Sequence, residues 1–230
     1  MTLHSNTIQI SNLTKIYNNF FLQISEESIP LGKIYGIIGH NGCGKTTLLK
    51  ILAGIVKQNT GTISYPLSQR EITMVFKEPY LINDTVENNL TYPLKLRNIK
   101  PSEEIINKYL KLTNLISKKN ENATLLSSGQ SQKLSIARAL IFEPKLILID
   151  EGFANMDVES VDFFEKYLLQ YQKDKDITIV IVSHNISNIK RMCHYVYFMD
   201  KGNIVTHGTT QDILSNSNIT SLKKFLYYTH

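Results

Sequence analysis

The sequence has few cysteines: Cys43 and Cys193 are the only two in 230 residues. A disulfide framework is therefore not indicated, and we expect the chain to work in a reducing cytoplasm. Apart from His184, the histidines are scattered without the spacing of metal ligands, which predicts no zinc site. A strong charge of one sign is also lacking, because the net charge is +5 and the lysines are scattered. We therefore expect no nucleic-acid partner.

Long hydrophobic runs are lacking as well. No apolar stretch approaches the roughly 20 residues of a membrane-spanning helix. The first residues do not form a charged segment followed by an apolar one, as a signal peptide would. If the protein works at a membrane, another chain must supply the spanning part. With 42% apolar residues and no internal repeat, the chain is predicted to form one domain, residues 1–230, around a sizeable core.

The segment 39–46 reads Gly-His-Asn-Gly-Cys-Gly-Lys-Thr and fits the phosphate-binding pattern G-x-x-x-x-G-K-[ST]. It lies between a predicted buried strand, 34–38, and a predicted helix, 47–53, which is the context that this motif requires. The glycines let backbone N–H groups approach phosphates, and the helix N-terminus adds partial positive charge. Lys45 is suited to the β- and γ-phosphates, and the Thr46 hydroxyl to Mg²⁺. The expected nucleotide ligands are Gly39, His40, Asn41, Gly42, Cys43, Gly44, Lys45, Thr46 and Thr47.

A second phosphate-chemistry element follows about a hundred residues later. The apolar run 146–149 predicts a buried strand, and Asp150 and Glu151 come directly after it. Asp150 is suited to hold Mg²⁺ through its water shell. Glu151 is suited to orient or deprotonate an attacking water. Two acids after an apolar run are a weak signal alone, but together with the phosphate loop they indicate nucleotide hydrolysis.

The remaining pattern predicts an α/β fold. Segments 7–10 and 20–24 alternate like edge strands around a turn at 18–19. A helical insertion is expected at about 85–140, because 3.6-residue periodicity replaces short apolar runs there. The expected class is a phosphate-loop NTPase core with a mostly parallel sheet, an antiparallel β edge subdomain and an inserted α-helical subdomain. Leu222, Phe225 and Leu226 mark either a short amphipathic helix or a frayed tail. Further strands are expected at 61–65, 72–76, 177–182, 195–199 and 204–206, and a helix at 161–169.

Segment 126–133, Leu-Ser-Ser-Gly-Gln-Ser-Gln-Lys, lies shortly before Asp150. Here the chain resembles the ATP-binding-cassette (ABC) ATPases, whose motif is L-S-G-G-Q. The resemblance covers nearly all 230 residues, and the motifs occur in the family's order. Tyr17 matches the adenine-stacking position, Asp157 ends the loop after the second acid, and His184 matches the switch histidine. The signature residues are Ser127, Ser128, Gly129 and Gln130.

This resemblance implies a single ABC ATPase domain that uses ATP and Mg²⁺. Lys45, Glu151 and His184 would form the catalytic set, with Thr46 and Asp150 as metal ligands. Two copies would close head-to-tail, so that each signature segment contacts the γ-phosphate bound by the other copy. The homodimer would energise an integral-membrane permease from the cytoplasmic face of the cell membrane, together with a solute-binding protein if the system is an importer.

Three of these residues have simpler alternative roles. The Tyr17 ring could instead cover the core. His184 could be a core histidine, although its place at a strand end favours the switch role. Asp157 could act as a helix N-cap, alone or in addition to its role in the family.

Three positions depart from the family's pattern. Lys77 stands where the family has a Gln that ligates Mg²⁺. An ammonium group has no acceptor, so we expect Lys77 to reach for a phosphate oxygen or for solvent. Ser128 replaces a Gly, which costs on the order of 1 kcal/mol if that position needs a positive φ. Gly152 replaces a Pro and is expected to loosen its loop. Together these departures predict a slow ATPase rather than an inactive one.

Two further expectations concern surfaces. Cys43 lies near a helix N-terminus, which predicts a lowered thiol pKa and protection from alkylation by ATP. The alternative is that its side chain packs against the sheet. The permease is expected to dock on the helical insertion in a groove lined by apolar side chains, whose alternative role is the insertion's own core. These side chains are Tyr80, Leu81, Ile82, Val86 and Leu90.

The transported substrate is the least determined property, because no residue of such a subunit touches it. Segments 70–79, 83–90 and 94–97 resemble ATPases of importers for tungstate, molybdate or phosphate. An amino-acid importer and an exporter of small molecules or peptides are the alternatives. A soluble ABC ATPase acting on ribosomes or DNA would need a second cassette or a coiled coil. A phosphate-loop kinase would leave segment 127–130 without a role.

Overall fold

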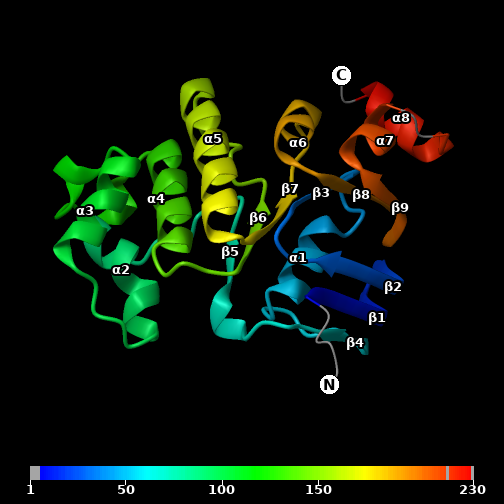
Figure 1. Ribbon diagram of the computed structural model, residues 1–230, viewed down its shortest axis with the longest axis horizontal. Helices are drawn as coiled ribbons and strands as arrows, with labels where there is room; N and C mark the ends of the chain where they lie inside the picture. The colour runs from blue at the N-terminus through cyan, green and yellow to red at the C-terminus, as the bar shows by residue number, and fades with distance from the viewer. Residues whose placement is uncertain (1–5, 216–217, 229–230) are drawn as a thin grey trace.

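The computed structural model describes residues 6–215 and 218–228, which form two sheets with helices around them (Figure 1). The larger sheet has six strands in the order β5-β6-β7-β3-β8-β9. All neighbours in it are parallel except β8 and β9, which form an antiparallel hairpin. Residues of β6 and β7 are buried along their whole length, as expected for a parallel sheet covered on both faces. The strands are β3 (Ile34–Gly39), β5 (Ile72–Val75), β6 (Leu146–Asp150), β7 (Thr178–Val182), β8 (Tyr195–Asp200) and β9 (Asn203–Thr209).

The smaller sheet is antiparallel and has the order β2-β1-β4. Its strands are β1 (Thr7–Tyr17), β2 (Phe20–Pro30) and β4 (Thr60–Ser64). Tyr17 pairs directly with Phe20 across the turn that the sequence predicts. Both hairpin strands are longer than predicted, because polar residues continue them on the exposed face while Leu13, Ile24 and Ile29 fill the buried one.

Each face of the larger sheet packs against a different set of elements. Leu146 and Leu148 of β6 belong to a core shared with helix α1 (Lys45–Leu52) and the small sheet. Ile147 and Ile149, which alternate with them, belong to a second core. That core is built with helices α4 (Ser128–Leu140), α5 (Val158–Lys175) and α6 (Ile186–Met192). Alternation along the strands therefore places α1 and α4 on opposite faces of the sheet.

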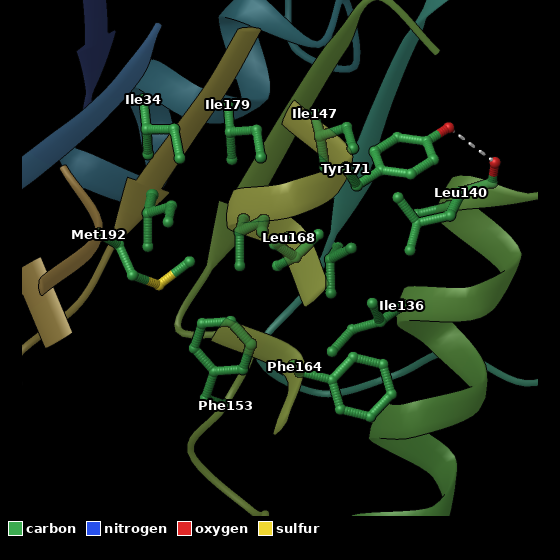
Figure 2. Close-up of a cluster of buried hydrophobic side chains, with 14 of the residues drawn as sticks. Ile34, Ile136, Leu140, Ile147, Phe153, Phe164, Leu168, Tyr171, Ile179 and Met192 are labelled. Carbon is green, nitrogen blue, oxygen red and sulfur yellow. Dashed lines mark hydrogen bonds between the residues drawn. The ribbon is translucent and has the colours of Figure 1, made fainter. Parts of the chain in front are cut away.

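Figure 2 shows the second core in detail. Ile34, Ile147 and Ile179 project from three neighbouring strands toward Phe164 and Leu168 of α5. These five side chains are at most 1% exposed. Burying a side chain of this size contributes about 1.5–3 kcal/mol, so this face anchors the strands whose ends carry the site. Tyr171 of α5 donates a hydrogen bond to the backbone oxygen of Leu140 at the end of α4.

The segment between β5 and β6 contains α2 (Val86–Leu96), α3 (Glu103–Leu112) and α4. Thr85, Ser102 and Ser127 cap the N-termini of these three helices through side-chain oxygens. The predicted class, a mostly parallel α/β core with an antiparallel subdomain and an inserted helical one, is confirmed. The subdomain bounds of about 85 and 140 stay a prediction. Short 3₁₀ turns lie at η1 (Gln69–Glu71), η2 (Ile116–Lys118) and η3 (Ala123–Leu125).

The expected docking groove is corrected at two positions. Val86 and Leu90 are fully buried in the core and cannot contact a partner. Leu81 packs partly against the same core, whereas Tyr80 is 78% exposed. The four-residue spacing of Val86 and Leu90 on a helix predicts an apolar face. It does not show whether that face is covered by this chain or by a partner.

The described C-terminal segment is helical. Of the two alternatives for Leu222, Phe225 and Leu226, a short amphipathic helix or a frayed tail, the helix is therefore correct. The segment forms α7 (Thr210–Ser215) and α8 (Thr220–Tyr228). Leu222 and Phe225 of α8 are buried, and the Phe225 ring lies 5.7 Å from that of Phe198 and 5.3 Å from that of His40 in the phosphate loop. Within residues 6–215 and 218–228, none of the helices combines the length and apolar character needed to cross a bilayer.

Candidate active site

The phosphate loop joins the carboxyl end of β3 to the N-terminus of α1. Gly39, Gly42 and Gly44 have φ values of +149°, +76° and +107°, which side chains rarely permit. A Cβ at Gly39 would lie 2.1 Å from the backbone oxygen of Met199, whereas one at Gly42 would meet no atom within 4 Å. The free space above Gly42 belongs to a cavity of about 420 Å³. Its lining residues are Asn19, Phe20, Asn41, Gly42, Gly44, Lys45, Thr46, Thr47, Glu151 and His184.

Lys45 is held inside this loop. Its Nζ donates hydrogen bonds to the backbone oxygens of Gly39, at 2.8 Å, and His40, at 2.9 Å. The residue is only 6% exposed, yet its atoms line the cavity. An ammonium group, N–H groups of a helix N-terminus and open space above a glycine are suited to phosphate oxygens.

Thr46 and Asp150 meet although they belong to different motifs. Thr46 Oγ1 donates a hydrogen bond of 3.0 Å to Asp150 Oδ1. Asp150 ends β6, and burial raises the pKa of its carboxyl group, an effect that the hydrogen bond from Thr46 opposes. A hydroxyl and a carboxylate oxygen are the donor types that Mg²⁺ prefers. The residues present therefore fit this ion beside the phosphate loop.

Glu151 has a left-handed backbone, with φ of +50°, and its N–H donates to the backbone oxygen of Val182 at 2.9 Å. Its Oε1 lies 2.7 Å from His184 Nε2, and its Oε2 lies 2.8 Å from Lys77 Nζ. Burial alone would raise the pKa of Glu151, but Lys77 and His184 outweigh it and hold that pKa below its usual value. Glu151 is thus an ionised carboxylate at the edge of the cavity, the form that a general base requires.

This contact gives Lys77 a partner that the sequence does not predict. Its ammonium pairs with Glu151, which raises the pKa of Lys77, while the side chain stays 56% exposed, as the solvent alternative predicts. The contact with a phosphate oxygen stays a prediction. The sequence pattern did not reveal the partner, because position 77 follows one strand and position 151 another.

His184 follows the carboxyl end of β7 and lines the same cavity. Its side chain is 39% exposed, which argues against a core histidine. Its contact with Glu151 orients the ring. The predicted contact with a γ-phosphate stays a prediction.

The signature segment lies at the N-terminus of α4. Ser127 Oγ accepts a hydrogen bond from Gln130 N–H, and Gln130 Oε1 accepts one from Ser127 N–H, so the two form a capping box. Ser128 is the first helical residue and has no positive φ, so the conformational cost considered for it does not arise. A Cβ at Gly129 would lie 3.1 Å from the Asn155 backbone oxygen, so this glycine packs closely on the loop after Glu151.

Among the described residues that line the phosphate-loop cavity, none comes from the signature segment. The reason is topological, since α1 and α4 cover opposite faces of the sheet (Figure 1). One copy of the chain therefore brings together the phosphate loop, Asp150, Glu151 and His184, but not Ser127.

The sequence model of the family described as "ABC transporter" matches residues 22–154, more than half of the chain. The chain belongs to the ABC transporter ATPase family. Tungstate uptake system ATP-binding protein TupC of Peptoclostridium acidaminophilum is 37% identical over 209 residues, covering 86% of this chain and 96% of that protein. Methionine import ATP-binding protein MetN 1 of Bacillus cereus is 31% identical over 240 residues, covering 95% of this chain and 69% of the relative.

A solved structure agrees with this assignment. The structure of cbiO1 from Clostridium perfringens, described as part of the ABC transporter complex cbiONQ, is 28% identical. It superposes with a TM-score of 0.74 over 91% of this chain and 90% of that one. The ABC ATPase described here is therefore an ATP-binding and ATP-hydrolysing enzyme whose family couples hydrolysis to transport.

In this ABC ATPase, Asp157 is the N-cap of α5. Its Oδ1 accepts a hydrogen bond of 2.8 Å from Ser160 N–H, as its alternative role predicts. Its Oδ2 also lies 3.6 Å from Lys133 Nζ of α4. The pair connects the helix that carries the signature with the loop that follows Glu151.

Cys43 does not have the lowered thiol pKa that the sequence predicts. Burial raises its pKa, and the attraction to Lys45, whose Nζ lies 3.9 Å from Sγ, only reduces that effect. The residue is 4% exposed and packs in the core beneath the loop, near Gly39. The alternative role, packing against the sheet, is therefore correct.

Tyr17 lies at the tip of the hairpin and is 44% exposed, with Lys15 Nζ 5.3 Å from its ring centre. Its adenine-stacking role stays a prediction. Asn19 and Phe20 also line the phosphate-loop cavity, a role that the sequence does not predict for them. Phe20 Cζ would lie 2.8 Å from a Cβ at Gly44, so its ring covers the loop. The sequence feature that indicates this role is the pair of aromatic residues, Tyr17 and Phe20, on either side of a two-residue turn.

A second cavity, of about 760 Å³, adjoins the first at Glu151 and His184. It lies between the loop that precedes α5 and the N-terminus of α6. Arg191 lines it and pairs with the buried Glu165. Its other lining residues are Gly152, Phe153, Ala154, Met156, Val158, Val161, Asp162, Val182, Ser183, Asn185 and Asn188.

Proposed function

We propose that this ABC ATPase powers an importer of an oxyanion such as tungstate, acting as a homodimer on an integral-membrane permease. One observation carries the catalytic part: Lys45, Thr46, Glu151 and His184 line one cavity, and Thr46 contacts Asp150. The substrate class rests on the 37% identity with a tungstate uptake protein over 96% of its length.

The phosphate loop would bind the triphosphate of ATP. Open space above Gly42 admits phosphate oxygens, and the ammonium of Lys45 supplies a positive charge beside them. Thr46 and Asp150 would hold Mg²⁺, whose charge neutralises the phosphates when it is bound. The aromatic tip of the hairpin, with Tyr17 as the predicted stacking residue, would bind the adenine.

Glu151 and His184 would carry the chemical step. The Glu151 carboxylate accepts a proton from the attacking water, which becomes the nucleophile. His184 holds the carboxylate at Oε1 and, by its place on the cavity wall, is suited to orient the water.

A second copy would complete the site. Ser127 and Gly129 belong to a helix on the opposite face of the sheet from α1, so in this chain they do not reach the phosphate-loop cavity. A head-to-tail homodimer would bring the α4 N-terminus of one copy to the nucleotide of the other. ATP would then hold the dimer closed, and hydrolysis would let it open.

The Glu151→Gln variant tests this proposal. It is expected to bind MgATP, to lose hydrolysis by about a hundredfold, the size of a general-base contribution, and to accumulate as a dimer. Phosphate release and light scattering after size-exclusion chromatography measure both properties. Glu104→Gln, at an exposed position of α3, is the matched control and should behave like the wild type. A monomeric Glu151→Gln protein in saturating MgATP would contradict the shared site.

The substrate proposal is tested in cells. Deleting the chain should abolish high-affinity tungstate uptake, measured by mass spectrometry of cell metal content, and leave methionine uptake unchanged. Methionine import is the second candidate, because a methionine import protein aligns with 95% of this chain at 31% identity. Loss of methionine uptake alone would favour that candidate.

The partner proposal has its own test. We propose that the chain lies on the inner face of the cell membrane, bound to a permease, with a solute-binding protein on the other side. Affinity purification from detergent-solubilised membranes should recover a protein with several membrane spans. Co-sedimentation with ribosomes instead would favour the soluble alternative.

A further inference from the structure

Both carboxylate oxygens of Glu151 already have partners. Oε1 contacts His184 at 2.7 Å and Oε2 contacts Lys77 at 2.8 Å. The ammonium of Lys77 takes up a lone-pair position of Oε2 that an attacking water would otherwise use. The carboxylate is also held in one orientation. The contact with Lys77 therefore opposes the role that the proposed function gives to Glu151.

The sheet imposes this contact. Strands β5 and β6 are parallel neighbours, and Val75 pairs with Ile149 at their carboxyl ends. Lys77 and Glu151 each follow two residues later, so they leave the sheet side by side. Because Lys77 is positively charged and Glu151 negatively charged, the two neighbouring side chains form an ion pair.

Glu151 has an uncommon backbone conformation directly after β6. Its φ of +50° is uncommon for a residue with a side chain. Gly152 follows, and a Cβ there would lie 2.6 Å from Ile149 Cγ2. A proline at position 152 would also disfavour the α region for the residue before it. Gly152 therefore permits the turn that the ion pair uses.

We propose that Lys77 is a latch on Glu151: a positioning residue that occupies Oε2 and fixes the orientation of the carboxylate until its ammonium group leaves. This inference rests on the proposed role of Glu151 as general base. The Lys77 side chain is 56% exposed and that of Glu151 is 16% exposed. Such a pair is weak enough to open during turnover. Its effect is to slow basal hydrolysis without contributing to nucleotide binding.

Substitution of Lys77 tests the latch through kcat and KM measured separately. Lys77→Met and Lys77→Gln remove the charge, so kcat should rise about two- to fivefold, the range that an exposed ion pair supports. KM for ATP should change less than twofold. Lys77→Arg keeps the charge and should retain the low kcat. Lys166→Met is the matched control, because Lys166 pairs with Asp162 at 2.7 Å on the α5 surface.

Combining the substitution with Glu151→Gln separates the latch from the role of Glu151. If Lys77 acts through Glu151, Lys77→Met should not raise kcat in the Glu151→Gln background. Should Glu151→Gln alone retain full hydrolysis, the general-base assignment fails, and the latch fails with it. If instead Glu151→Gln is inactive and Lys77→Met leaves kcat unchanged or lower, the latch alone is wrong.

The ion pair can also be tested without measuring hydrolysis, through the chemical reactivity of the Lys77 amine. In nucleotide-free protein, acetylation of Lys77 by an amine-reactive ester is followed by mass spectrometry. Pairing with Glu151 protects the amine, so Lys77 should react several-fold faster in Glu151→Gln than in the wild type. Lys166 should react equally in both proteins. Equal rates at Lys77 would overturn the ion pair in solution.

Discussion

Thr46 Oγ1 and Asp150 Oδ1 lie 3.0 Å apart, although the two residues are separated by 104 positions in the chain. Thr46 lies in the first turn of α1 and Asp150 ends β6, and α1 packs on the face of the sheet to which β6 contributes Leu146 and Leu148. The fold therefore brings a hydroxyl and a carboxylate to the same point beside the phosphate loop. Together the two groups supply two of the oxygen donors that the proposed magnesium ion would need.

Asp150→Asn should weaken the magnesium-dependent part of ATP binding. An amide oxygen carries no charge, so the dissociation constant for MgATP is expected to rise about tenfold, while ATP binding in EDTA changes little. Titration with a fluorescent ATP analogue, with and without Mg²⁺, measures both values. An equal loss of affinity under the two conditions would show that Asp150 acts on the loop and not on the metal.

The phosphate loop offers a comparison between two glycines. Gly42→Ala should cost about 1 kcal/mol of stability, the cost of a left-handed residue, because its Cβ meets no atom. It should nevertheless abolish ATP binding, since that Cβ would fill the space for the phosphates. Gly39→Ala should destabilise the fold itself, because its Cβ would lie 2.1 Å from the Met199 backbone oxygen.

Thermal unfolding and nucleotide titration separate the two glycine variants. Gly42→Ala should unfold within a few degrees of the wild type and bind no ATP. Gly39→Ala should unfold at much lower temperature or fail to accumulate. Normal ATP affinity in Gly42→Ala would mean that the triphosphate does not approach this glycine.

Local patterns were sufficient to predict most of the core strands and the places of the phosphate loop and the two acids in the fold. Parallel strands buried on both faces appear as short apolar runs, which is why Asp150 and Glu151 could be placed at the end of β6. The glycine spacing likewise identified the loop around Lys45. These inferences succeeded because each depends on residues that are neighbours in sequence.

Other features depend on contacts that the linear pattern does not contain. The partner of Lys77 follows from the register between β5 and β6. The pKa of Cys43 depends on whether its side chain turns toward solvent or toward the sheet. The burial of Val86 and Leu90 depends on α3 and α4 packing over them. In each case tertiary packing determines the outcome. The sequence alone either leaves two alternatives open or favours the wrong one.

The two thiols should be unreactive in the folded protein. Cys43 and Cys193 are both buried, and burial raises the pKa of each thiol. A thiol-specific reagent at pH 8 should modify far less than one equivalent within minutes, because little thiolate is formed or accessible. Unfolding in guanidinium should expose both. Rapid modification of Cys43 that MgATP prevents would contradict the raised pKa of this thiol. It would support the lowered pKa that its place near a helix N-terminus predicts.

Arg191→Ala should destabilise the contact between α5 and α6. Arg191 donates to both carboxylate oxygens of Glu165, at 2.9 and 3.0 Å, and the Glu165 side chain is 4% exposed. Removing the arginine leaves a buried charge without its cation, which should cost about 2 kcal/mol, less than a fully buried pair because Arg191 is 54% exposed.

Urea denaturation of three variants measures this contribution. Lys166→Ala breaks the exposed pair with Asp162 on the same helix and should cost under about 0.5 kcal/mol. Glu165→Gln combined with Arg191→Met removes both charges and should recover part of the stability lost in Arg191→Ala. A loss in Arg191→Ala no larger than that in Lys166→Ala would mean that water reaches Glu165. The second cavity, which Arg191 lines, would then extend to the carboxylate.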